Sequence, residues 1–452
     1  MASLIRVSPE SYCPFVIWGD DAPTSRRVGR NVRELAFYSP FSEGDADFKR
    51  VPMAVLQNGE AMAKHTEHVV KQTIVWSCNA AMRNRHPHSG PYETQALQKT
   101  LQTLSGQPIR ADGVTLTFAG FTGDWAFVAA DFDMEWHYNT EQVCHMCKAA
   151  KHGAVLNLSD ASENAAWNKP ENARSLADYI TSLISRGRQP EHWNPLTSLC
   201  GFHTHGFFED QLHCDCLGIR QHCNGSSLVS LCFEGTWGDM SASGTWSDKL
   251  DSVLATAHVA FSVWCTRNQI TTSHPVFNCL NLHMHKASDY AQLKSKGHNS
   301  AMITKWLLTV CEDAVDVSKP ESGLRFSLMW GLNALWDIPH DCRPRFVYSD
   351  AEAVQLETAR KVALMSLYGL HKFYAMKGEH LFNIVPKFHQ VDHMCRRQIR
   401  SKLACSLWWC FASESAIGSV ARTAGKTHGA STNRRAVQRW ITFFWGSFIN
   451  SD

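Results

Sequence analysis

Three acidic residues lie in separate parts of the sequence, each next to a short motif. Asp20 follows an apolar run, Asp210 opens an Asp-x-x-His string, and Glu414 stands just before an Ile-Gly pair. Carboxylates from strand ends and a facing helix can bind hard divalent cations, which take oxygen ligands. Two such cations stabilise the attacking and leaving oxygens of an in-line phosphoryl displacement. The three residues therefore predict a nuclease or polynucleotidyl transferase in which they bind Mg²⁺ or Mn²⁺.

Asp215 competes with Asp210 for the second position. We expect both residues where a strand ends in a turn, and residues five apart on a strand point to opposite faces, so only one of them can face Asp20. We favour Asp210 because His213 accompanies it. His213 is either an accessory catalytic residue or a buried, hydrogen-bonded core histidine.

The elements that must position these residues follow from the spacing of apolar side chains. Strands are predicted at 12–18, Leu35–Tyr38, Val51–Leu56 and Val114–Phe121, with a helix over Ala61–Met82 between the third and fourth and a short helix through Asp133 after the fourth. A polar, loop-rich stretch extends to about Pro195. Helical periodicity then dominates in Leu250–Trp264, Ala301–Val315, Leu324–Trp336 and Ala351–Lys377.

Several short motifs occur in the order used by one group of transposases. They are Trp18-Gly19-Asp20-Asp21, Trp76-Ser77, Gly123-Asp124-Trp125, Cys144-x-x-Cys147, Trp167, Asp210-x-x-His213, Lys387-Phe388-His389 with His393, and Glu414 with Ile417-Gly418. The sequence resembles the CACTA- and Plavaka-like DDE transposases, especially the transposase-derived proteins abundant in dinoflagellate genomes.

This resemblance implies an α/β fold: a ribonuclease H-like mixed sheet flanked by helices, with a large helical insertion before the last catalytic helix. Residues 1–240 would form the core, with a Cys-x-x-Cys insertion at about 134–200, residues 241–385 the helical insertion, and 386–452 the C-terminal part of the core. Asp21, Asp215 and His389 would be accessory residues. Asp21 stands where the group usually has glycine, and Ser413 and Ser415 stand where acidic neighbours of Glu414 are common. We therefore expect weakened metal binding.

Cys144 and Cys147 have the spacing of half a zinc site, because a tight turn lets two thiolates bind one tetrahedral ion. The other half would come from a dense group of candidates, namely Cys200, His203, His205 and Cys214. Two buried free thiols are the alternative interpretation.

Basic residues gather toward the C-terminus and predict a surface that contacts DNA phosphates irrespective of sequence. They are Arg396, Arg397, Lys402, Arg434, Arg435 and Arg439. A solvated helix face is the alternative. The whole chain is not basic, with 44 Lys and Arg against 42 Asp and Glu, so DNA binding would depend on such local clustering.

Composition sets the cellular context of the prediction. Sixteen cysteines without a signal segment indicate reduced thiols in the nucleus or cytoplasm and not a secreted protein. No apolar run reaches the roughly 18–20 residues that span a bilayer, so we expect a soluble protein without a membrane partner. We predict a transposase-derived DDE nuclease that acts on DNA and could self-associate. The alternative is a non-catalytic DNA-binding or protein-interaction module that retains the fold.

Overall fold

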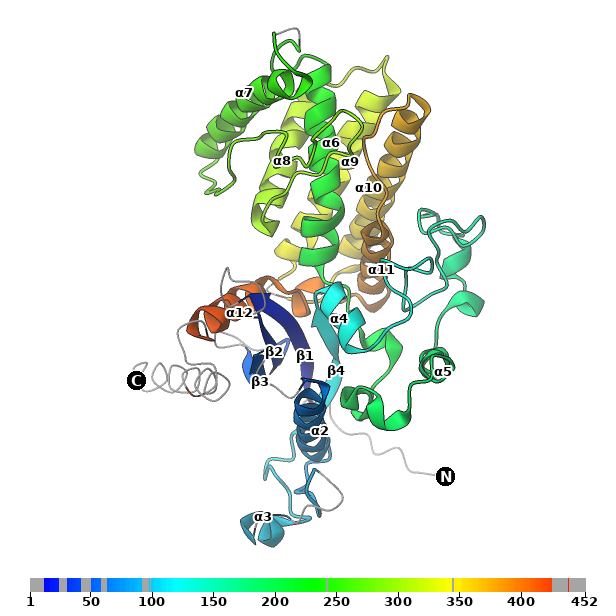
Figure 1. The fold of residues 1–452 in the computed structure, drawn as a ribbon, viewed down its shortest axis with the longest axis vertical. Helices are drawn as coiled ribbons and strands as arrows, with labels where there is room; N and C mark the ends of the chain where they lie inside the picture. The colour runs from blue at the N-terminus through cyan, green and yellow to red at the C-terminus, as the bar shows by residue number, and fades with distance from the viewer. Residues whose placement is uncertain are drawn as a thin grey trace. The chain divides into compact units, whose positions relative to one another are not determined.

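The computed structural model describes residues 12–23, 31–41, 50–57, 63–91, 97, 99–240, 243–343, 345–424 and 438 (Figure 1). The chain divides into two compact units. Unit 1 comprises Met1–His137, Arg174–Phe208 and Cys410–Asp452, and unit 2 comprises Tyr138–Ala173 and Glu209–Trp409. The chain therefore passes between the units after residues 137, 173, 208 and 409, whereas the expected boundaries follow residues 240 and 385.

Unit 1 contains a mixed four-stranded sheet with the order β3-β2-β1-β4. The strands are β1 (Tyr12–Pro23), β2 (Asn31–Tyr38), β3 (Val51–Gln57) and β4 (Thr115–Gly123). The first three strands pair antiparallel in sequence order, whereas β4 pairs parallel to β1. Because parallel neighbours need a crossover connection, the chain passes through α2 (Ala63–Met82) and α3 (Lys99–Leu104) before β4 begins. The predicted strands, the first helix and the α/β class are confirmed.

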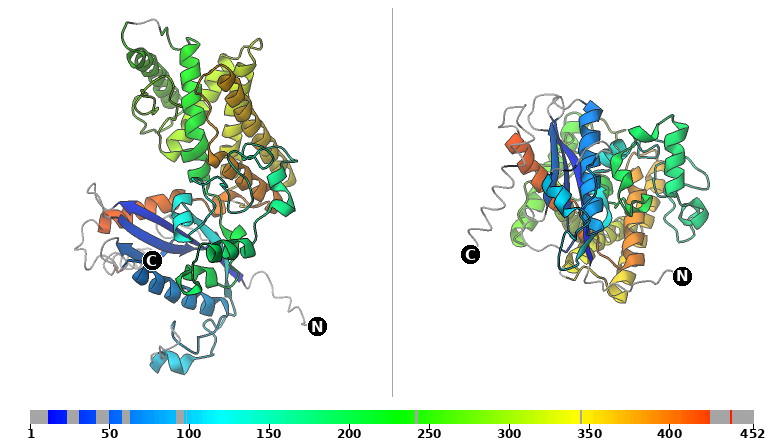
Figure 2. Two further views of the ribbon diagram at one scale, coloured as in Figure 1. Left: turned by 45° about the vertical axis from the view of Figure 1, so that its right-hand side comes forward. Right: turned by 90° about the horizontal axis from the view of Figure 1, so that it is seen from below.

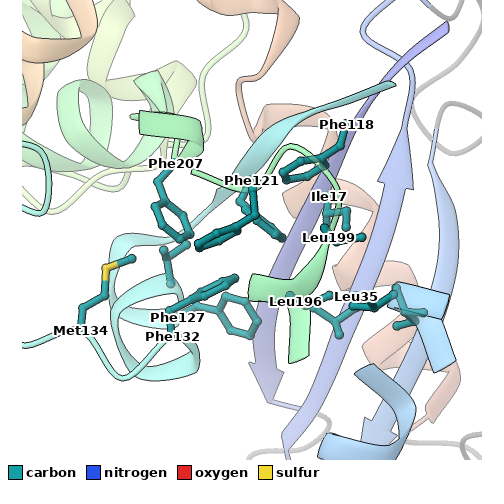
Figure 3. Packing of buried hydrophobic residues seen from close by; sticks show 14 of the residues in the cluster. Ile17, Leu35, Phe118, Phe121, Phe127, Phe132, Met134, Leu196, Leu199 and Phe207 are labelled. Carbon is teal, nitrogen blue, oxygen red and sulfur yellow. The ribbon is translucent and has the colours of Figure 1, made fainter. Parts of the chain in front are cut away.

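One face of the sheet packs against α2, α4 (Trp125–Asp131) and α5 (Leu176–Ser185). β1 contributes Phe15 and Ile17 to this core, because alternate residues of a strand share a face. Figure 3 shows how phenylalanine rings from β4, α4 and the segment after α5 meet there; Phe121 stacks on Phe207 with ring centroids 5.5 Å apart.

The opposite face of the sheet packs against α12 (Phe411–Ala424). Val32 on β2, Val55 on β3 and Ala421 on α12 form a small buried cluster, and Ala22 on β1 packs against it. The sheet of unit 1 therefore has helices on both faces (Figure 2).

Unit 2 is mainly helical. Its principal helices are α6 (Arg220–Phe233), α7 (Trp246–Arg267), α8 (Gly297–Asp313), α9 (Pro320–Asp341), α10 (Asp350–Met376) and α11 (Pro386–Ser401). α9 packs against both α8 and α10, and α10 packs against α11. Serine and threonine begin two of these helices with reciprocal capping boxes, Thr245 with Asp248 and Ser349 with Glu352. The predicted helical periodicity is confirmed.

The strand expected around Asp210 and Asp215 is wrong. Residues Leu212–Ile219 form a π-helical turn that leads directly into α6. Nearly every residue of this stretch is buried, so its apolar residues show neither the alternation of a half-buried strand nor the stripe of a surface helix. The expectation that these two carboxylates point to opposite faces of a sheet is also withdrawn.

Glu34 on β2 is a buried carboxyl group that makes unit 1 sensitive to pH. It is 3% exposed, and burial raises its pKa from 4.5 to about 7, against the opposing charge of Arg50. The folded state therefore keeps a proton that the unfolded chain releases, and stability is lost as pH rises from about 4.5 through 7.

We expect Glu34→Gln to remove this dependence. Between pH 4.5 and pH 8, the unfolding free energy of the metal-free variant should gain roughly 3 kcal/mol relative to the wild type, as a shift of this size implies. Urea denaturation at both pH values measures it. A constant difference between the two proteins would mean that Glu34 titrates normally in the folded chain.

Candidate metal centres

Two carboxylates in unit 1 directly follow the last paired residues of the parallel strands β1 and β4. Gly19 on β1 pairs with Gly123 on β4, so the next residues, Asp20 and Asp124, lie side by side at the same end of the sheet. The Asp124 carboxylate also caps α4 by accepting a hydrogen bond from the Ala126 N–H at 3.4 Å. Asp124 was not predicted as a site residue, although its place directly after a predicted strand was a signal for it.

Glu414 lies on the helix that covers the same face as Asp20. Asp20 shares its face of β1 with Ala22, which packs against Ala421 of α12. Glu414, Ile417 and Ala421 are spaced three and four apart on α12, so they form one stripe along the helix, and both apolar members of the stripe are buried. Glu414 therefore projects toward the sheet from the side that Asp20 faces.

A polar contact fixes the start of α12 beside the end of β4. The Thr122 hydroxyl lies 3.4 Å from the Cys410 thiol, both buried, and the Glu414 N–H donates to the Cys410 carbonyl at 2.9 Å. Glu414 is thus one helical turn from this contact, and Asp124 is two residues beyond Thr122. The carboxylate oxygens of Asp20, Asp124 and Glu414 are not among the described groups whose donor atoms meet within 4.8 Å, so cation binding would require rotation of these side chains.

Asp21, the expected accessory residue, faces away from Asp20. Its two carboxylate oxygens each accept a hydrogen bond from Arg33 at 2.9 Å, and Arg33 also contacts Glu67 of α2 at 2.6 Å. Burial opposes ionisation of Glu67, yet Lys71 and Arg33 hold its pKa at about 2. The side chains of Arg33, Glu67 and Lys71 line a cavity of about 950 Å³ on the α2 face. Asp21 therefore belongs to this network of ion pairs.

Asp210 and Asp215 belong to unit 2, whereas Asp20 and Glu414 belong to unit 1. The Asp210 carboxylate accepts hydrogen bonds from the backbone N–H of His213 at 3.0 Å and from its ring Nδ1 at 2.7 Å. Asp215 forms a fully buried ion pair with Arg220, with contacts of 2.6 and 3.1 Å. Both carboxylates thus have local partners, and Asp210 remains a prediction as a metal ligand.

A second candidate centre lies within unit 2 and joins Cys144 and Cys147 to two histidines of α11. The four donor atoms of Cys144, Cys147, His389 and His393 lie within 4.8 Å of one another. The Cys147 sulfur is 3.2 Å from Nε2 of His389 and 3.4 Å from Nε2 of His393. Trp167 packs against both imidazoles, with ring centroids 4.4 and 4.9 Å away. The group is therefore enclosed, as in structural zinc sites.

The electrostatics of this group favour metal-binding states of Cys144 and His389, whereas, against the effect of burial, the charge of Cys144 raises the pKa of His393. Burial opposes ionisation of the Cys144 thiol, yet a hydrogen bond with Cys147 and the charges of the two imidazoles lower its pKa well below the usual range. Burial also lowers the pKa of His389, which favours the neutral ring. Thiolate sulfur and neutral imidazole are the forms that coordinate zinc. Two thiolates and two imidazoles would complete a tetrahedral zinc site.

The residues that lie beside the predicted zinc pair differ from those expected. The sequence pattern pointed to Cys200, His203, His205 and Cys214, whereas the group contains His389 and His393. His389, expected near the catalytic carboxylates, belongs to the cysteine–histidine group. The missed signal was the His-x-x-x-His spacing, which places two imidazoles on one face of a helix.

The predicted basic face is only partly present among the described residues. Arg396 is 9% exposed and donates to the Asp392 carboxylate and the Ser162 carbonyl, both at 2.8 Å. Arg397 pairs with Glu209 at 3.0 Å, and the exposed Lys402 pairs with Asp350. The expectation that Arg396 contacts DNA is therefore replaced by a structural role. Arg434, Arg435 and Arg439 lie outside the described residues.

No protein-family model matches the chain, and no curated protein matches it. Among the helices described above, none is both long enough and apolar enough to cross a bilayer.

We expect one equivalent of zinc in the purified chain, because the four donor atoms are already gathered. Cys144→Ser and His393→Ala should each lose the metal and lower the melting temperature. Cys200→Ser, at an exposed thiol, is the matched control and should keep it. Elemental analysis measures the content; less than half an equivalent, unaltered by Cys144→Ser, would make these residues ordinary core side chains.

Arg396→Ala should destabilise unit 2 without changing DNA affinity. Removing the guanidinium leaves Asp392 with Arg360 as its remaining cationic partner and takes the Arg396 hydrogen bond from the Ser162 carbonyl, whereas the Ala161 carbonyl still accepts from Arg360; the loss is on the order of 3 kcal/mol. Chemical denaturation measures the stability, and the salt dependence of DNA binding measures whether Arg396 contributes to DNA affinity. If the variant instead lowered the slope of the logarithm of DNA affinity against the logarithm of salt concentration by about one unit, Arg396 would be a phosphate contact.

Proposed function

We propose that the chain is a DDE-type nuclease or DNA strand-transferase core that acts by two-metal phosphoryl transfer. One observation carries this proposal: Asp20 and Asp124 directly follow Gly19 and Gly123, the last paired residues of the parallel strands β1 and β4, and Glu414 lies on the helix that covers the same face. Oxygen ligands gathered from two strand ends and a helix suit Mg²⁺ or Mn²⁺.

The topology of unit 1 supports a ribonuclease H-like core. Three antiparallel strands lead through α2 to a fourth strand that is parallel to the first and adjacent to it. The chain later returns to this edge, where Phe207 forms a parallel bridge to Phe121 of β4. The segment after the helical unit then supplies α12, as expected for an insertion before the last catalytic helix.

We favour Asp124 over Asp210 as the second carboxylate. Asp124 is placed beside Asp20 by the β1–β4 register, within one unit, whereas the Asp210 carboxylate is bound to His213 in the other. The Asp210 carboxylate would then serve to orient the His213 imidazole through Nδ1.

The bound cations would activate a water molecule, and later a 3′-hydroxyl, and stabilise the leaving oxygen. The residues of the chain would hold these ions: Asp20 and Asp124 from the sheet and Glu414 from α12. Sequence-independent phosphate contacts would come from basic residues, including those beyond α12.

A non-catalytic DNA-binding module is the second candidate. Two features favour it: Asp21 is held by Arg33 on the opposite face, and Ser413, beside Glu414, is fully buried. Neither position adds negative charge near the three carboxylates, so cation affinity would be low.

We expect weak Mn²⁺-dependent nicking of supercoiled DNA, with less product in Mg²⁺. Asp20→Ala, Glu414→Ala and Asp124→Asn should abolish it; asparagine caps a helix as well as aspartate, so the last change spares α4. Asp210→Asn is the matched comparison and should leave some activity. Nicking lost with Asp210→Asn but kept with Asp124→Asn would restore Asp210 as the ligand. Salt-sensitive DNA binding without any metal-dependent cleavage would support the non-catalytic module.

A further inference from the structure

Glu34 is a buried carboxylate directly across from Asp20. The two residues are partners in the antiparallel register of β1 and β2, so their side chains point to the same face with Cβ atoms about 5 Å apart. The next pair on that face, Ala22 and Val32, packs against Ala421 of α12. Glu34 therefore lies beneath the helix that carries Glu414.

The surroundings of Glu34 leave one of its two carboxylate oxygens without a hydrogen-bond partner among the described residues. Glu34 is 3% exposed, and that oxygen is its Oε2 atom. Its partner on β3 is the apolar Val55, and the charge that acts on it is that of the buried Arg50, whose guanidinium lies over the rings of Trp18 and Tyr38. An unsatisfied buried carboxylate oxygen is costly, and a bound cation is one way to satisfy it.

Other acidic groups near Asp20 are already engaged elsewhere. Asp21 is the next residue in the chain, yet it points to the α2 face and binds Arg33 through both oxygens. Glu67 on α2 belongs to the same network. Among the described residues of the four strands, Glu34 is thus the acidic residue that shares the Asp20 face.

We propose that Glu34 is an additional oxygen ligand of the divalent cation bound by Asp20. This inference rests on the proposed function and extends its ligand set from three carboxylates to four. Two divalent cations carry four positive charges, so four carboxylates would balance them. Glu34 would also supply, from β2, the negative charge that Asp21 and Ser413 do not provide.

The test measures Mn²⁺ affinity of the full chain by electron paramagnetic resonance, with the cysteine–histidine group first loaded with Zn²⁺. Glu34→Gln keeps the shape of the side chain and should weaken Mn²⁺ binding roughly tenfold or more, the scale of losing a group that supports a metal. Glu34→Asp keeps a carboxylate and should retain more affinity than Glu34→Gln. Glu67→Gln, on the other face, is the matched control and should bind Mn²⁺ like the wild type.

Denaturation by urea without metal separates ligation from folding. Glu34→Gln should be at least as stable as the wild type at pH 7, but Mn²⁺ should raise its urea midpoint less. If Mn²⁺ binding depends on Asp20 but is unchanged in Glu34→Gln, the role of Glu34 is overturned and the proposed function stands. An absence of Asp20-dependent Mn²⁺ binding in the wild type would overturn both.

Discussion

β1 and β4 approach each other closely at Gly19 and Gly123, and this contact determines the geometry of unit 1. A Cβ atom on Gly123 would lie 2.4 Å from the Gly19 carbonyl oxygen, and one on Gly19 would lie 2.4 Å from the Phe127 ring of α4. Only glycine allows the two strands and the helix to meet this closely. The carboxylates that follow, Asp20 and Asp124, are brought side by side because the parallel pairing of the two strands ends at these glycines. A side chain at either glycine would separate them.

The sheet also sorts charges between its two faces. Residues 20 and 21 alternate, so one carboxylate faces α12 and the other joins the ionic network around Arg33 on the α2 face. In the same way Arg33 and Glu34 are neighbours in β2, and their side chains point to opposite faces of the sheet. Pairing each carboxylate with Arg33 or Lys71 satisfies the charges on the α2 face. On the α12 face Arg50 acts on Glu34, but the Glu34 Oε2 atom has no hydrogen-bond partner among the described residues, which is why we associate this face with cations.

Much of unit 1 could be predicted from sequence because its strands are short apolar runs and its turns are polar. Asp20 was identified because it ends such a run, and Glu414 because of its flanking motif. Asp124 ends a run as well, but its role depends on the parallel pairing of β1 and β4, which connects residues about a hundred positions apart and leaves no local pattern. The buried stretch from Leu212 to Phe233 was misjudged because residues buried on all sides show no periodicity.

The cysteine–histidine group illustrates the same limit on a larger scale. Cys147 and His389 are 242 residues apart, so only the fold shows that they meet. The segment Tyr138–Ala173 has little regular structure, and its small core around Trp167 would gain rigidity from a metal that ties it to α11. Zinc would thus stabilise unit 2, whereas the proposed chemistry belongs to the carboxylates of unit 1.

The most direct measurement is the anomalous diffraction of crystals soaked in Mn²⁺. The proposed site predicts a Mn²⁺ peak at coordination distance, about 2.1 Å as for Mg²⁺, from carboxylate oxygens of both Asp20 and Asp124, with Glu414 beside it. A peak coordinated by Asp210 and His213 without Asp124, or no peak near Asp20 at saturating Mn²⁺, would contradict it.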